Sequence, residues 1–136
     1  MKKYEILEHK ADLQIRVFGG TKEELFQNAL LGMQESMKPE IRKQDKETKR
    51  KIKIKSTDLS ALLVDFLSEV LYLSQFQKEI FFDIIFEKLT DEELRGEFVG
   101  QRVARFNEDI KAVTHHQLDV HQGQDGIWQA TILFDI

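Results

Sequence analysis

The sequence has no cysteine, a single proline and only seven glycines in 136 residues. The absence of cysteine excludes disulfides, thiolate metal sites and a cysteine nucleophile, and it fits a reducing cytosol. So few prolines and glycines argue against disorder or a long linker. No uninterrupted apolar run approaches the roughly 20 residues that span a bilayer, and residues 1–5 carry no apolar signal core. We therefore expect a soluble, cytoplasmic protein with no membrane partner.

Size and composition are those of one globular domain over residues 1–136, with 41% hydrophobic and 10% aromatic residues. The formal net charge of −4 is unevenly distributed. Residues 38–55 contain nine Lys/Arg and three Asp/Glu, a net of +6, so the remainder carries −10. An acidic body with one basic segment is not typical of a dedicated nucleic-acid-binding protein.

Hydrophobic periodicity predicts two helices. The first begins at Thr21, which has capping-box spacing to Glu24, and ends before Pro39. The second follows the candidate caps in residues 56–58 and has an apolar stripe over residues 59–71. Alternating or continuous apolar runs predict strands over about 3–8, 13–18, 51–55, 80–86, 94–103, 110–121 and 127–136, of which 80–86 is apolar enough for a central strand. The predicted class is α+β, two-layer, with two helices packed on a mostly antiparallel mixed sheet.

Acidic groups near both ends of the chain are the main candidates for chemistry. Asp12 lies between two predicted strands, and Asp135 and the carboxyl group of Ile136 close the last one. If the last strand lies beside the first two, these oxygens converge, and clustered anionic oxygens favour a hard cation such as Ca²⁺ or Mg²⁺. By alternation, Asp135 points away from the core. The alternative is a turn residue beside a solvated terminus.

Other candidates carry weaker signals. His115 and His121 lie on one face of a predicted strand but about 20 Å apart, so they cannot share one ion. Lys111 shows no partner that would make it a nucleophile. The lysines of residues 46–55 could contact phosphates, but they also fit an edge strand protected from pairing, and no aromatic residues interleave for base stacking.

In three parts of the chain, the sequence resembles the archease family. Residues 8–12 (Glu-His-Lys-Ala-Asp) are similar to its opening signature, and residues 62–73 are similar to its long amphipathic helix. Residues 111–116 (Lys-Ala-Val-Thr-His-His) and the terminal residues 134–136 (Phe-Asp-Ile) complete the pattern. The resemblance covers nearly the whole chain, in order and spacing. It implies the archease fold, which agrees with the α+β class above.

The resemblance also implies a function: a protein cofactor, not an enzyme, that assists the RNA ligase joining 2′,3′-cyclic phosphate and 5′-hydroxyl ends. Such a protein promotes guanylation of the ligase by GTP and its multiple turnover, in tRNA splicing or RNA repair. RNA would be contacted only indirectly. The implied metal ligands are Asp12, Asp135 and Ile136, the implied functional lysine is Lys111, and Glu8 and His9 lie beside the site.

Three positions depart from the family pattern: Lys10 replaces the usual threonine, Gln14 the expected glycine, and His115 the commoner tyrosine before the second family histidine. Lys10 places a cation beside the proposed cation site, which predicts weaker metal affinity. Two other functions stay open. One is a chaperone-like adaptor for RNA-modifying enzymes such as methyltransferases. The other is a metal-dependent phosphoesterase, for which only His9 is near enough in sequence to act as the base.

Overall fold

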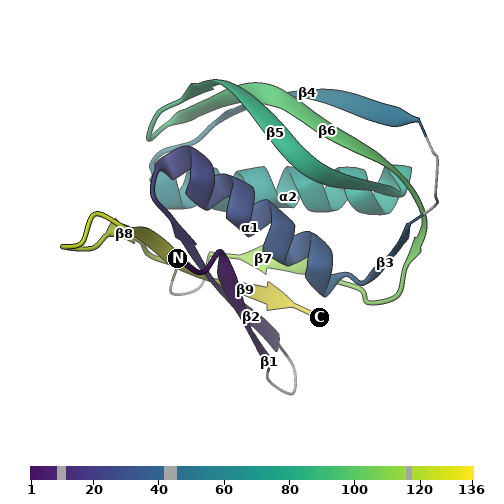
Figure 1. Cartoon of the computed structure of the whole chain (residues 1–136), viewed down its shortest axis with the longest axis horizontal. Helices are drawn as coiled ribbons and strands as arrows, with labels where there is room; N and C mark the ends of the chain where they lie inside the picture. The colour runs from purple at the N-terminus through teal and green to yellow at the C-terminus, as the bar shows by residue number, and fades with distance from the viewer. Residues whose placement is uncertain (9–11, 42–45, 116–117) are drawn as a thin grey trace.

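The computed structural model describes residues 1–8, 12–41, 46–115 and 118–136. Within them, two helices and nine strands follow one another along the chain (Figure 1). The helices are α1 (Lys22–Ser36) and α2 (Leu59–Gln77). The strands are β1 (Tyr4–Glu8), β2 (Asp12–Gly19), β3 (Pro39–Ile41), β4 (Glu47–Lys55), β5 (Glu79–Leu89), β6 (Glu93–Phe106), β7 (Ala112–Thr114), β8 (Val120–Gln122) and β9 (Trp128–Asp135).

The first sheet joins the two ends of the chain. Its strand order is β1-β2-β9-β7, and β8 also pairs with β9, with every pairing antiparallel. Figure 1 shows the C-terminus beside the β1–β2 hairpin. The predicted continuous strand over residues 110–121 is wrong. Strand β7 ends before the exposed polar residue His115, and the described residues return to strand structure only at Val120, so two three-residue strands, β7 and β8, form instead.

The second sheet is built around β6, the longest strand, which pairs antiparallel with β3, β4 and β5. Strand β4 is the basic segment, with its alternate lysines exposed, and among the described strands it pairs only with β6. This arrangement is that of the predicted edge strand. The prediction of a central strand over 80–86 is wrong, because β5 pairs only with β6 among the described strands and exposes Phe82 and Ile85.

The helices lie between the two sheets (Figure 1). Both predicted caps are confirmed: the Glu24 N–H donates to Thr21 Oγ1 at 3.1 Å, and the Ala61 N–H donates to Asp58 Oδ1 at 2.8 Å. These bonds satisfy donors that a helix start leaves without an intrahelical partner. The predicted α+β class of two helices on antiparallel β-structure is confirmed. The expected two layers with one mixed sheet are wrong, because the strands form two separate sheets, antiparallel in every described pairing, and the helices pack against both.

Aromatic rings from both helices and the second sheet form the centre of the core. Phe66 packs against Phe26 and Phe98 with ring centroids 5.4 and 5.7 Å apart, and Phe81 stacks on Phe98 at 4.9 Å. All four rings are fully buried. Helix α2 is long and apolar enough to span a membrane, with a hydropathy of 1.4. Its buried face packs between the two sheets, so it serves as a core helix.

An ion pair with a buried carboxylate joins Glu79 to the partly exposed Arg50 of the second sheet. Glu79 is completely inaccessible to solvent, and Oε1 accepts hydrogen bonds from Arg50 Nε at 3.0 Å and from its Nη2 at 2.6 Å. The hydrogen bond and the charge of Glu79 raise the pKa of Arg50 above its ordinary value. This pair joins β4 to the start of β5, directly after α2.

Candidate functional site

Asp12 and Asp135 lie directly opposite one another in the first sheet. Strands β2 and β9 are antiparallel neighbours, and their register pairs Asp12 with Asp135. Opposed residues of an antiparallel pair have their Cβ atoms about 4.5–5.5 Å apart and their side chains on one face. The structure therefore brings together the two carboxylates that the sequence analysis expected to converge. Their role as metal ligands stays a prediction.

Both carboxylates lie on the face of the sheet that points away from the core. Alternate residues of β2 and β9 are buried, including Leu13 beside Asp12 and Phe134 beside Asp135. Because side chains alternate along a strand, the two aspartates occupy the opposite, outer face. The outward direction expected for Asp135 is confirmed, and its side chain is exposed.

Asp12 holds an oxygen atom without a partner. Its Oδ1 is inaccessible to solvent, yet it accepts no hydrogen bond from the part of the chain that the structure describes. A carboxylate oxygen removed from water in this way is unfavourable unless a donor or a cation satisfies it. This observation marks the carboxylate pair as a candidate ligand site.

Lys111 reaches the same corner through its backbone. Its N–H donates to the Asp135 carbonyl oxygen at 2.7 Å, and the next residue, Ala112, pairs with Asp135 in the sheet. The residue itself lines a shallow hollow of about 260 Å³ beside α2, together with Ser68 and Tyr72. The backbone of Lys111 therefore adjoins the carboxylate pair, whereas the residue lines the hollow beside α2.

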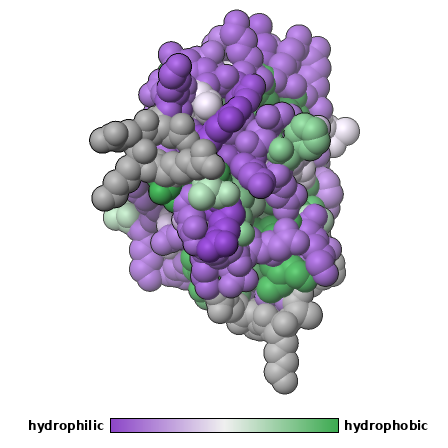
Figure 2. Space-filling view, turned by 90° about the vertical axis from the view of Figure 1, so that its right-hand side faces the viewer, coloured by the Kyte–Doolittle hydropathy of each residue, from purple (hydrophilic) through white to green (hydrophobic). Residues whose placement is uncertain are grey.

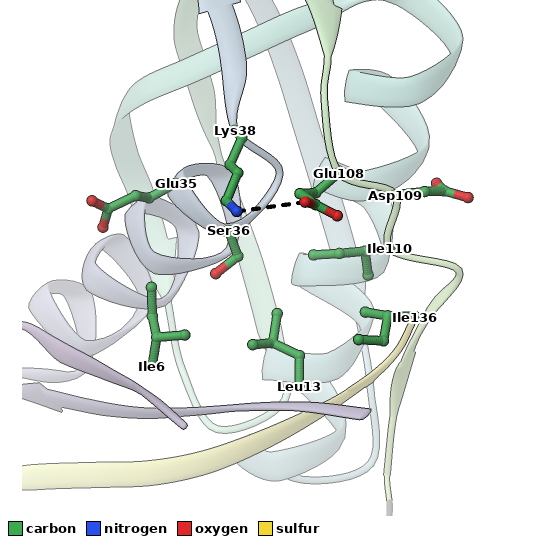
Figure 3. A pocket seen from close by; sticks show the side chains of 9 residues that line it. All are labelled: Ile6, Leu13, Glu35, Ser36, Lys38, Glu108, Asp109, Ile110 and Ile136. Atoms are coloured by element: carbon green, nitrogen blue, oxygen red, sulfur yellow. Dashed lines mark hydrogen bonds and ion pairs between the residues drawn. The ribbon is translucent and has the colours of Figure 1, made fainter. Parts of the chain in front are cut away.

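The remaining expected site residues are placed only in part. Glu8 ends β1, with its backbone paired to Leu13, and His9 and Lys10 lie outside the described residues. Ile136 follows Asp135 directly, is 45% exposed, and lines a cavity of about 460 Å³ (Figure 3). The site is thus assembled from β2, β9 and the start of β7.

No group of three or more His, Cys, Asp or Glu side chains that could hold a metal ion occurs among residues 1–8, 12–41, 46–115 and 118–136. The two aspartates are a pair, so a third protein ligand must come from elsewhere. A main-chain oxygen of Ile136 is the adjacent candidate. An all-oxygen set of this kind suits Ca²⁺ or Mg²⁺, whereas zinc usually takes nitrogen or sulfur ligands.

The histidines do not join this site in the described part of the chain. His121 lies on β8, where Nδ1 is 3.0 Å from Asp119 Oδ2 and Nε2 is 2.7 Å from Gln129 Nε2. It lines an outer-face hollow of about 530 Å³ that also contains Arg16. His115 is exposed just after β7, and His116 lies outside the described residues.

The sequence analysis missed the cavity shown in Figure 3. The walls of the cavity come from five separate parts of the chain, and periodicity within one segment does not predict such a juxtaposition. One usable signal was Ile110, an apolar residue directly after the turn-like residues 107–109.

Comparison with known proteins extends these observations to the whole chain. Residues 4–136 match the model of the Archease protein family (MTH1598/TM1083). Protein archease of Methanosarcina acetivorans is 39% identical to this chain, and the alignment covers 99% of this chain and 97% of that archease. Protein archease of Pyrococcus furiosus is 33% identical, with both chains fully covered.

Two solved structures share the fold. The solution structure of protein 1598 from Methanobacterium thermoautotrophicum superposes with a TM-score of 0.75 at 26% identity, and both chains are fully covered. The crystal structure of an archease from Thermotoga maritima, described as a possible chaperone, gives a TM-score of 0.69 at 21% identity and covers 96% of this chain and 94% of its own. The family match over residues 4–136, the two relatives and the shared fold lead to one conclusion: this chain belongs to the archease family.

Proposed function

We propose that this protein is a cytoplasmic activator of an RNA ligase and not itself an enzyme. The ligase joins 2′,3′-cyclic phosphate and 5′-hydroxyl RNA ends, and the activator promotes its guanylation by GTP and its multiple turnover, in tRNA splicing or RNA repair. The family membership supports this proposal. The single observation that carries the site assignment is the pairing of Asp12 with Asp135 across β2 and β9.

The residues of the pair fit a divalent cation. Oδ1 of Asp12 has no hydrogen-bond partner among the described residues, Asp135 supplies a second carboxylate, and the adjacent Ile136 supplies main-chain oxygens. A bound Ca²⁺ or Mg²⁺ would supply charge neutralisation for phosphate oxygens during nucleotidyl transfer. The chain's part is to hold the two carboxylates on a rigid pair of strands, so that their separation is fixed before the ligase binds.

Lys111 provides a second contact at the same corner. Its N–H fixes the backbone of Asp135, and its ammonium group can pair with a phosphate or with a carboxylate of the ligase. Glu8 precedes the β1–β2 connection and His9 lies within it, so both are proposed as neighbours of the ligase contact. The proposed contact surface therefore comprises the β1–β2 connection, the end of β9 and the start of β7.

A second candidate function is a chaperone-like adaptor for RNA-modifying enzymes. The Thermotoga maritima relative is described as a possible chaperone, and this chain shares its fold. An adaptor of this kind would bind its partner without a cation. Pull-down of a methyltransferase that persists in chelator would favour the adaptor function over ligase activation.

The test is a guanylation assay with purified ligase, GTP and a divalent cation. Wild-type protein should accelerate the formation of ligase–GMP, and Asp135→Ala should not, because one of the two carboxylates is lost. Glu87→Ala is the matched control, since Glu87 is an exposed acidic residue on β5 in the other sheet. Equal stimulation by the wild type and by Asp135→Ala would remove the proposed mechanism.

A further inference from the structure

A cavity of about 460 Å³ with several apolar lining residues lies near the carboxylate pair (Figure 3). Four aliphatic side chains form its inner wall: Ile6 from β1, Leu13 from β2, Ile110 from the segment before β7, and Ile136 after β9. Figure 3 shows these four side chains on the lower side and Ser36, from the end of α1, above them. The cavity therefore has an apolar floor that is open to solvent at one side.

Three of the four floor residues are sequence neighbours of the proposed site residues. Leu13 follows Asp12, Ile136 follows Asp135, and Ile110 precedes Lys111. Because side chains alternate across a sheet, the carboxylates lie on the outer face, and their neighbours turn to the other side. One corner of the first sheet thus presents the carboxylate pair and, behind it, an apolar cavity.

The rim of the cavity is acidic. Three carboxylate side chains and one lysine line it: Glu35, Glu108, Asp109 and Lys38. Lys38 Nζ lies 3.4 Å from Glu108 Oε1, so this pair is neutral as a unit. Among the described lining residues, Glu35 and Asp109 then remain as net negative charge, and Figure 3 shows their carboxylates at opposite sides of the opening.

The hydrogen bonds that these two acids make do not cancel their charge. Glu35 accepts from the Tyr4 hydroxyl, and Asp109 Oδ1 accepts from Gln75 Nε2 at 3.0 Å. Both donors are uncharged. A segment that fills the cavity would therefore meet an apolar wall in the centre and two anionic groups on either side.

We propose that this cavity anchors the partner protein by accepting one large apolar side chain from a segment in which basic residues flank that side chain. The apolar floor selects the anchor, and Glu35 and Asp109 select the flanking arginines or lysines by charge complementarity. Ile6 and Ile136, 37% and 45% exposed, would be covered on binding. Identifying the partner as the RNA ligase rests on the proposed function.

In this arrangement the cavity binds the partner, and the adjacent carboxylate pair acts in guanylation. A segment held in the cavity lies next to the carboxylate pair, so binding there positions that pair against the partner. Figure 2 shows a largely hydrophilic surface on one side of the molecule, with apolar groups in small separate patches. Anchoring through a single enclosed apolar contact with a charged rim suits such a surface.

The test uses two variants and their matched controls. Ser36→Leu fills the cavity from α1, and Ser36→Ala removes the same hydroxyl without filling it. The double variant Glu35→Lys/Asp109→Lys reverses the rim charge, and Glu87→Lys reverses an exposed charge on the other sheet. Affinity for purified ligase is measured by titration at two salt concentrations, after thermal unfolding has confirmed that each variant is folded.

Excluding a buried apolar anchor should weaken binding roughly 10- to 100-fold in Ser36→Leu. The rim variant should bind more weakly and lose most of the salt dependence, whereas both controls should match the wild type. Asp135→Ala should lose stimulation of guanylation, with a smaller loss of affinity for the ligase than Ser36→Leu shows. Ser36→Leu and the rim variant both binding as tightly as the wild type would overturn the anchor and leave the proposed function intact.

A second measurement does not depend on the ligase. Blocked Arg-Leu-Arg and Glu-Leu-Glu tripeptides are titrated into the wild-type protein, and the methyl signals of Ile110 and Ile136 are followed by NMR. The basic peptide should shift both signals and the acidic peptide neither. If the wild-type protein does not bind the ligase, the proposed function fails. The peptide titration then still tests whether the cavity accepts an apolar side chain flanked by basic residues. The absence of any shift with the basic peptide would refute the anchor.

Discussion

Replacing Asp135 with asparagine removes one of the two carboxylates that face each other across β2 and β9. Like charges directly opposite in a sheet destabilise it. Because Asp135 is exposed, we take the dielectric constant of bulk water, for which two unit charges about 5 Å apart repel each other by about 0.5–1 kcal/mol at low salt. The backbone bond from the Lys111 N–H to the Asp135 carbonyl oxygen is kept in the variant. We therefore expect Asp135→Asn to be more stable than the wild type without divalent cations.

Divalent cation should reverse that order. A ligand at 100 times its Kd stabilises the folded state by about 2.7 kcal/mol, which is larger than the repulsion it relieves. The wild type should gain this stabilisation in Ca²⁺ or Mg²⁺, and Asp135→Asn should gain little of it. The variant should therefore be the more stable protein without divalent cation, and the wild type the more stable one with it. This reversal is the result expected of a carboxylate pair that holds a cation.

Thermal unfolding in chelator and in excess Ca²⁺ measures both effects. In chelator, Asp135→Asn should melt roughly 2–4 °C above the wild type. The control Glu87→Gln removes an exposed carboxylate from the other sheet and should respond to Ca²⁺ as the wild type does. A lower melting temperature for Asp135→Asn in chelator, or equal gains in Ca²⁺, would refute the reasoning.

Three further predictions concern the scaffold. Arg50→Ala leaves the buried carboxylate of Glu79 unpaired and should lower the free energy of unfolding by about 3–5 kcal/mol in urea denaturation. Gly100→Ala should lower it by at least about 2 kcal/mol, because the added Cβ overlaps a carbonyl oxygen of β5, and a melting temperature equal to the wild type would contradict this. Burial raises the pKa of Glu93, but the hydrogen bond and charge of Lys88, with two further basic groups, lower it more, to a net value below 4.5. The stabilisation from Glu93 is therefore present above its ordinary pKa and lost as the pH falls through the lowered one, so Glu93→Gln should destabilise at neutral pH and not in strong acid.

The local features of the fold were predictable because neighbouring residues determine them. The caps at Thr21 and Asp58 follow from side-chain oxygens placed at helix starts, and the outward direction of Asp135 follows from alternation with Phe134. The α+β class follows from the change in periodicity along the chain. The family resemblance added the expected roles of the site residues, which periodicity alone does not specify and which stay predictions.

The features that the sequence did not predict depend on contacts between distant segments. The strands form two sheets, and both helices lie between these sheets. The hydrophobic pattern within one strand does not indicate which sheet that strand joins. The break between β7 and β8 escaped prediction because apolar residues lie on both sides of the polar residues 115–117, a pattern that also fits one continuous strand. The cavity needs Ile6, Ser36 and Ile110 together, and only the folded chain brings them together.

The central claim is that Asp12 and Asp135 jointly hold a cation. Crystals of the wild-type protein grown with Mn²⁺, a hard divalent ion with a strong anomalous signal, test it most directly. The account predicts one anomalous peak coordinated by both carboxylates, and no such peak in crystals of Asp135→Asn. Crystals of the wild type in which Mn²⁺ binds elsewhere, or contacts neither aspartate, would contradict it.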